Sequence, residues 1–176
     1  MNESLLRYKD ERDKSYGIAG MAITLVACNG EDKLSEINID AEPGECMVMN
    51  HEFGFKGSPA MSARFVWEET LKDLRLTTLM ALGNISCRRR ILEHSRLSSK
   101  MTEKIHKAVI DEARDHCNLE KDEAERLFDS CMQYVDRIFS HAIIPSIATN
   151  FANEIAERRS MTVTEATELL GRLGLR

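Results

Sequence analysis

Histidine and cysteine are the side chains with which this chain could do acid–base or nucleophilic chemistry near neutral pH, and it holds five of each. His51 is the first candidate, because it lies in a run of alternating apolar residues and is followed by Glu52. A general base needs a partner that positions it. Neighbouring residues of a strand point to opposite faces, so Glu52 would not orient the His51 ring. We interpret His51 as a histidine at the seam between a sheet and a helix, not as a catalytic base.

A metal site is the second chemistry that these residue types suggest. Two predicted neighbouring helices carry possible ligands, namely His106, His116, Cys117, Cys131 and His141. Closed zinc sites bring their ligands in short paired spacings, and di-metal bundles repeat a Glu-x-x-His pattern on two helices. Neither pattern is met here. The sequence therefore predicts no metal and no cofactor.

Short catalytic and nucleotide-binding motifs are missing from the chain. It contains no GxxxxGK[ST], GxGxxG, GxSxG or HExxH string. Many active sites are assembled from scattered residues, so this absence does not exclude an enzyme. The sequence leaves the question of an enzyme open and leans against it.

Charge argues against a nucleic-acid or membrane partner. Residues 1–57 carry 6 Lys+Arg against 11 Asp+Glu, which accounts for the whole net charge of -5. Arg88, Arg89 and Arg90 would fan out around a helix and form no single patch, so we interpret them as a solvated helix end. No run approaches the roughly 20 apolar residues of a membrane span. We expect neither nucleic acid nor membrane as a partner.

The cysteines suggest a reducing compartment. Their number is odd and they form no CxxC pair, which favours reduced, buried thiols in a cytoplasmic protein. One alternative is an exported lipoprotein, because Leu25-Val26-Ala27-Cys28 resembles a lipoprotein cleavage box. The residues before it carry balanced charge, whereas an export signal needs a positive leader, so this alternative ranks lower.

The first third of the chain predicts a small sheet. Residues 1–16 form a polar arm of undecided conformation, and residues 18–56 form a three-stranded antiparallel meander. The first strand is the apolar run 18–28, and Asn29-Gly30 is a strong hairpin signal because both residues tolerate positive φ. The spacing changes phase between Leu34 and Ile37, which predicts a bulge or a four-residue loop. The last strand alternates from Met47 to Phe55.

The rest of the chain, residues 58–173, predicts a bundle of four to five helices. A long apolar helix from Ser58 to His94 would be its centre and would cover the sheet. Gly83-Asn84 is its weak point, where the helix kinks or another backbone comes close. Amphipathic helices follow over about 101–117, 120–142 and 145–158, and Thr162 with Glu165 predicts a capping box at the start of the last helix. One α+β domain over residues 1–176 fits best.

The last of these helices also carries a short resemblance. The string Met161-Thr-Val-Thr-Glu-Ala-Thr-Glu-Leu-Leu-Gly171 is similar to the first helix of winged-helix DNA-binding domains of the MerR and excisionase type. Such domains need a second helix to enter the major groove, and only five residues follow Gly171 here. We interpret the similarity as shared capping-box and leucine-face chemistry.

Two functions follow from this organisation. The long central helix has more apolar surface than a small sheet covers, and the sheet has open edges, so we expect a structural or protein-interaction module that forms homo-oligomers. The alternative is a small-molecule-binding protein or enzyme. Its pocket would lie between the sheet and the central helix, lined by His51, Phe53, Phe55 and Trp67.

Overall fold

The computed structural model of the protein describes residues 7–50 and 63–175, with side chains from Trp67 onward in the second range. These ranges contain six α-helices and one three-stranded antiparallel sheet, which confirms the predicted α+β fold class. The helices are α1 (Glu11–Ala27), α2 (Ala63–Ser86), α3 (Ser99–Cys117), α4 (Lys121–Phe139), α5 (Ile144–Arg158) and α6 (Val163–Arg172). The strands are β1 (Leu34–Asn38), β2 (Met47–Met49) and β3 (Ser160–Thr162). A 3-10 turn, η2 (Glu31–Lys33), precedes β1, and a π-helical turn, η3 (Cys87–Leu92), continues α2.

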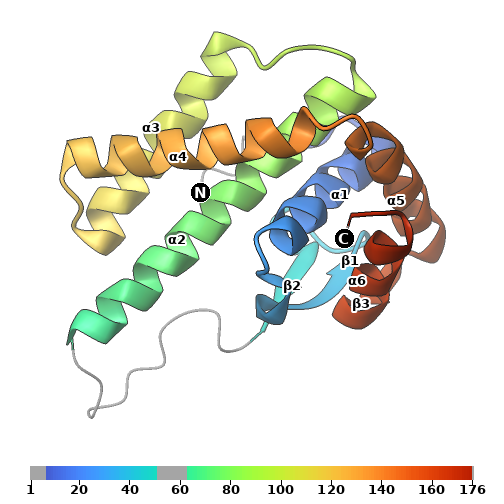
Figure 1. The fold of residues 1–176 in the computed structure, drawn as a ribbon, viewed down its shortest axis with the longest axis horizontal. Helices are drawn as coiled ribbons and strands as arrows, with labels where there is room; N and C mark the ends of the chain where they lie inside the picture. The colour runs from blue at the N-terminus through green and yellow to red at the C-terminus, as the bar shows by residue number, and fades with distance from the viewer. Residues whose placement is uncertain (1–6, 51–62, 176) are drawn as a thin grey trace.

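The elements gather into two parts that share α2 (Figure 1). One part, which we call the head, contains α1, α5, α6, the sheet and the second half of α2 with η3. The other part, which we call the arm, contains α3, α4 and the first half of α2. The long helix α2 therefore belongs to both parts.

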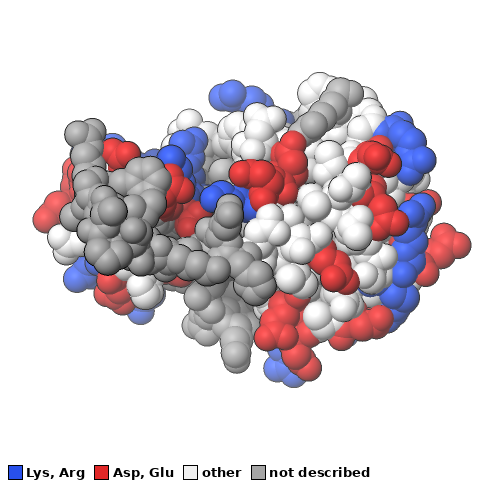
Figure 2. Space-filling model, turned by 90° about the horizontal axis from the view of Figure 1, so that it is seen from below, with Lys and Arg blue, Asp and Glu red and all other residues white. Residues whose placement is uncertain are grey.

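The surface carries both signs of charge. On the face in Figure 2, acidic and basic side chains are interspersed, and neither sign forms one continuous patch. None of the helices in the described ranges has the length and apolar character needed to cross a membrane.

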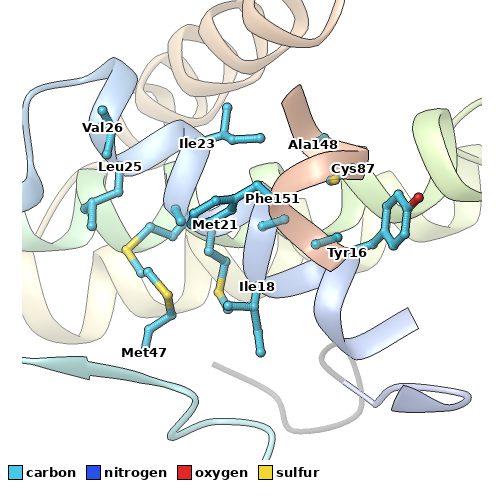
Figure 3. Close-up of a cluster of buried hydrophobic side chains, with 14 of the residues drawn as sticks. Tyr16, Ile18, Met21, Ile23, Leu25, Val26, Met47, Cys87, Ala148 and Phe151 are labelled. Atoms are coloured by element: carbon cyan, nitrogen blue, oxygen red, sulfur yellow. The ribbon is translucent and has the colours of Figure 1, made fainter. Parts of the chain in front are cut away.

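Helix α1 lies at the centre of the head, and the prediction of a strand over residues 18–28 is wrong. Every residue from Ser15 to Val26 is buried. Met47 of β2 reaches toward Met21 and Ile18 on one side of α1, and Phe151 of α5 packs near its middle (Figure 3). A short run that is apolar on all sides has no period that distinguishes a buried helix from a strand.

The predicted polar arm is also shorter than expected. Residues 11–16 belong to α1, and Asp10 caps this helix by accepting a hydrogen bond from the backbone N–H of Asp13 at 2.7 Å. Asn29-Gly30, predicted as a hairpin turn, ends the same helix. Asn29 has φ 54°, and the Gly30 N–H donates to the Leu25 carbonyl at 2.9 Å. Tolerance of positive φ suits a helix end as well as a hairpin.

The sheet has the strand order β2-β1-β3. Its register shifts between Leu34 and Glu36, in the stretch where the change of phase predicted a bulge or a four-residue loop. The third strand is residues 160–162, from inside the predicted helical region, so the prediction of a meander built only from residues 18–56 is wrong. Of the predicted strand from Met47 to Phe55, only Met47–Met49 is a strand in the described residues. The part beyond Asn50 lies outside them.

Helix α2 and the turn η3 give the long helix that the sequence predicted, within the described residues 63–92. The helix does not break at Gly83-Asn84. Instead, the backbone of α1 comes close, because a Cβ built on Gly83 would lie 2.6 Å from the Gly20 carbonyl oxygen. In the described residues, β1 and β3 contact α6, and Met47 of β2 reaches toward α1 (Figure 3). The sequence predicted α2 as the cover of the sheet, and these contacts with α6 and α1 correct that prediction.

Helices α3 to α6 follow their predictions closely. Asn118 has φ 51° at the end of α3, and Pro145 lies in the first turn of α5. Thr162 and Glu165 form the predicted capping box, in which each side chain accepts a hydrogen bond from the backbone N–H of the other.

Candidate functional site

A cleft of about 610 Å³ lies beside α2, where the end of α1 comes near α4. The described part of its lining comes from three separate segments of the chain. These residues are Cys28, Asn29, Gly30, Asp32 and Lys33 after α1, Glu69, Lys72, Asp73, Arg75, Leu76 and Leu79 on α2, and Tyr134 on α4. The volume lies inside the range of roughly 300–1,000 Å³ that ligand pockets occupy.

Gly30 sets how closely the end of α1 approaches α2. A Cβ at this position would lie 3.0 Å from the Cδ1 atoms of both Leu25 and Leu76. A side chain here would press against both leucines, so glycine permits the close approach that forms this wall of the cleft.

Tyr134 closes the cleft from the α4 side. Its hydroxyl donates a hydrogen bond to the carbonyl of Ala27 at 2.6 Å, which ties α4 to the last residue of α1. Burial raises the pKa of Tyr134, so the phenol stays protonated at neutral pH and acts as a donor.

The thiols beside the cleft are not poised as nucleophiles. Burial raises the pKa of the half-buried Cys28 thiol, which donates to the Leu25 carbonyl at 3.2 Å. Burial likewise raises the pKa of Cys131 to about 11. The thiolate is the reactive form of cysteine, so both side chains are protonated and unreactive near neutral pH.

The charged groups around the cleft are balanced in sign. Lys72 and Glu69 form an ion pair at 2.6 Å on the surface of α2, and the hydrogen bond from Lys72 lowers the pKa of Glu69. The remaining charged lining residues are Asp32, Lys33, Asp73 and Arg75. Among the described residues the lining thus holds three cations and three anions, which suits a partner that carries both signs more than a phosphate or another simple anion.

A second hollow, of about 480 Å³, adjoins the first on the α4 side of α2. Lys72 and Arg75 line both, and the others around the second are Glu68, Leu71, Arg126, Leu127 and Ser130. We call the two hollows together the α2 groove. It follows α2 from Glu68 to Leu79, which is about 17 Å at 1.5 Å per residue.

Only one of the four residues predicted to line the pocket lies within the described residues. His51, Phe53 and Phe55 lie outside the described residues. Trp67 is described, and its side chain is 43% exposed. Its indole N–H donates to the carbonyl of Cys117 at 2.8 Å, which joins α2 to the end of α3. Trp67 is not among the described residues that line either hollow.

The predicted absence of a metal cluster concerned five histidine and cysteine positions on α3, α4 and the turn after α4. In the described ranges no group of three or more His, Cys, Asp or Glu side chains is placed to hold a metal ion. Cys117 and Cys131 are buried, and the His106 ring packs edge-on against Phe128 with 4.9 Å between ring centroids.

Sequence reasoning missed a buried polar cluster around Arg88. This residue was predicted to be solvated, but it is only 6% exposed. Its Nε donates to Asp13 Oδ1 at 2.6 Å, its Nη2 also binds Asp13, and its Nη1 donates to Asn84 Oδ1 at 3.3 Å. The ring of Tyr8 lies over the guanidinium, 4.7 Å from the ring centroid. Asn84, a polar residue within an apolar run of α2, was the signal that could have indicated such a cluster, whereas Asp13 lies in a run of charged residues and gave no such signal.

Comparisons with protein-family models, with curated proteins and with solved structures found no match to this chain. The geometry of the described residues is therefore the basis for any functional argument.

Proposed function

We propose that this protein is a protein-interaction module that self-associates through the α2 groove. The observation that carries the proposal is the length of the groove, about 17 Å along α2, with leucines and charges of both signs in its lining. A recess of this length accommodates about three turns of a helix from a partner.

The floor of the groove supplies apolar contact area. Leu71, Leu76 and Leu127 are half-buried in the single chain, so a docked segment would remove the rest of their surface from water. Burial of apolar surface is the main driving force for association, at roughly 25 cal/mol per Å².

The mixed rim favours a second copy of this chain as the partner. In a two-fold dimer each patch faces its own copy, so a patch with both signs can place cations against anions. The groove has Lys33, Lys72 and Arg75 beside Asp32 and Asp73.

Light scattering after size exclusion tests the proposal. We expect a dimer at tens of micromolar and a monomer for Leu76→Glu, which puts a charge on the groove floor. Ile143→Glu is the matched control, because Ile143 is 46% exposed and lies after α4, outside the groove. Circular dichroism verifies that each variant is folded. A wild-type chain that stays monomeric, or two variants that dimerise equally, would refute self-association through the groove.

A small-molecule-binding protein or enzyme is the second candidate, and the volume of the cleft beside Tyr134 favours it. Native mass spectrometry of protein purified from its host would detect a bound compound. Tyr134→Phe, which removes the hydrogen bond that holds the end of α1 at the cleft, would then weaken binding of that compound. An empty protein whose melting temperature does not shift with any compound of a fragment collection would count against this candidate.

We also propose a cytoplasmic location. The five cysteines, all of them within the described ranges, are free thiols, as suits a reducing compartment. Cleavage before Cys28, which the lipoprotein alternative requires, would remove the buried helix α1 from the head. Mass spectrometry of the native protein distinguishes these alternatives, because an intact N-terminus excludes lipoprotein processing.

A further inference from the structure

We propose that residues Arg7–Lys9 act as a latch that holds the turn η3 in its π-helical form. The proposal does not depend on self-association. It starts from the geometry of η3, in which the Glu93 N–H donates to the Arg88 carbonyl, five residues earlier, at 3.0 Å. Such turns are rare and occur mostly as single insertions in α-helices, frequently at functional sites. The surroundings must therefore favour the wider turn over the α-helical one.

The latch holds the first part of the turn through Arg88. The carbonyl of Arg7 accepts a hydrogen bond from Arg88 Nη2 at 3.0 Å, and the Tyr8 ring covers the guanidinium. A cation against an aromatic face contributes about 0.5–2 kcal/mol, with the larger values at buried positions. Asp13 binds the same guanidinium from α1.

The latch also holds the end of the turn. Lys9 Nζ forms an ion pair with Glu93, and the Lys9 N–H donates to Asp13 at 3.0 Å. Three consecutive residues thus contact both Arg88, near the start of η3, and Glu93, just after its end. The segment spans the turn that it stabilises.

Tyr8 occupies a socket that depends on a glycine. A Cβ on Gly17 of α1 would lie 2.6 Å from Tyr8 Cε1 and 2.8 Å from Asn84 Nδ2. The same side-chain amide donates from Asn84 Nδ2 to the Tyr8 hydroxyl at 2.8 Å, and Asn84 Oδ1 accepts a hydrogen bond from Arg88. The Tyr8 ring therefore fits only where Gly17 and the Asn84 amide leave room for it, which fixes the position of the latch.

Release of the latch would act on the arm. An α-helical turn over the same residues would rotate the chain after it by about one residue, roughly 100°. Arg90, within η3, forms an ion pair with Asp136 of α4, and the Ser95 N–H donates to the Arg89 carbonyl at 2.8 Å. These contacts depend on the present form of the turn. The latch therefore couples the N-terminal segment to the connection between head and arm.

Hydrogen exchange of full-length variants, followed by mass spectrometry, tests the latch. We expect Tyr8→Ala to speed the exchange of amides in residues 87–95 at least tenfold. Tyr8→Phe keeps the ring and should have a smaller effect. Gly17→Ala should act like Tyr8→Ala, because it fills the socket. Arg7→Ala is the control from the same segment, since Arg88 contacts the backbone oxygen of Arg7 and the Arg7 residue is exposed.

Two results would overturn the proposal. In the first, Tyr8→Ala frees residues 7–9 while residues 87–95 keep their wild-type exchange rates. In the second, exchange rises equally in α5 and α6, which would mean that Tyr8 supports the whole fold and not the turn.

Discussion

The head and the arm differ in how their cores are built. The head packs around α1, which contacts α2, α5 and η3, and the same core continues into the near end of the arm through buried residues such as Ile105 and Phe128. The far end of the arm has a small separate core of five buried residues, Leu74, Ile110, Ala113, Cys117 and Ala124. Many elements meet in the head, whereas three helices meet in the arm. The head should therefore set the global stability, and the end of the arm should open locally at a lower free energy.

The largest effect should come from the buried ion pair of the head. Arg88→Met leaves the Asp13 carboxylate buried without its cation, which typically costs about 3–5 kcal/mol. Arg89→Met is the adjacent control, because Arg89 pairs with Glu93 in a half-exposed position worth at most about 1 kcal/mol. Urea unfolding measures both. Equal losses in the two variants would mean that burial does not distinguish these arginines.

The same type of substitution, leucine to alanine, in both parts compares the stability of the head directly with that of the arm. Leu82→Ala in the head and Leu74→Ala in the arm each remove a buried side chain, for about 2–5 kcal/mol. We expect Leu82→Ala to lower the global free energy of unfolding. Leu74→Ala should mainly speed hydrogen exchange in residues 110–124. If exchange rose equally in α5 and α6 of the Leu74→Ala variant, head and arm would be one cooperative unit.

Acid should weaken the head through Asp13. Burial alone would raise the pKa of this carboxyl, but hydrogen bonds and charge from Arg88 and Lys9 lower it overall. A group whose pKa is lowered by folding stabilises the fold fully above its unfolded value, about 3.9, and this contribution is lost as pH falls below that value. Urea unfolding across this range measures the effect. Asp13→Asn should make the free energy of unfolding depend less on pH. An unchanged dependence on pH would mean that Asp13 is not its cause.

The helix caps should give the smallest effects. Thr162→Ala removes the capping box of α6 in the head, and Ser98→Ala removes the side chain that accepts the Met101 N–H in the arm. Each typically costs about 1 kcal/mol. We expect thermal unfolding to detect the first, and only faster exchange at the start of α3 to detect the second. The reverse ranking would contradict the division into a stable head and a weaker arm.

The pattern of burial within each element explains which elements could be predicted from the sequence. Helices α3 and α4 have one apolar stripe and one solvated face, so their period is visible in the sequence. Helix α1 is buried all round, so its sequence has no helical period, and this led to the incorrect prediction of a strand. The third strand could not be predicted either, because three residues between two helices give no alternating pattern. These residues form a strand because they pair with β1 in the folded protein.

The candidate site was predicted less well than the fold. The α2 groove combines residues after α1 with residues of α2 and α4, and no local spacing links Gly30 to Leu76 or Tyr134. The three adjacent arginines have different roles because Asp13 lies opposite only one of them. Charge patterns in one segment do not predict a partner that the chain brings from about 75 residues away.

The position of β3 has a consequence for synthesis of the protein. Strand β1 pairs with β2, which follows closely in the chain, but its other edge pairs with residues 160–162. A growing chain on the ribosome thus carries an open edge of β1 until residues 160–162, which lie more than a hundred residues later in the chain, have emerged. Occupation of that edge by another nascent chain is a misassembly to which this topology is exposed, and slow synthesis of the residues between β1 and β3 would lengthen the period of risk.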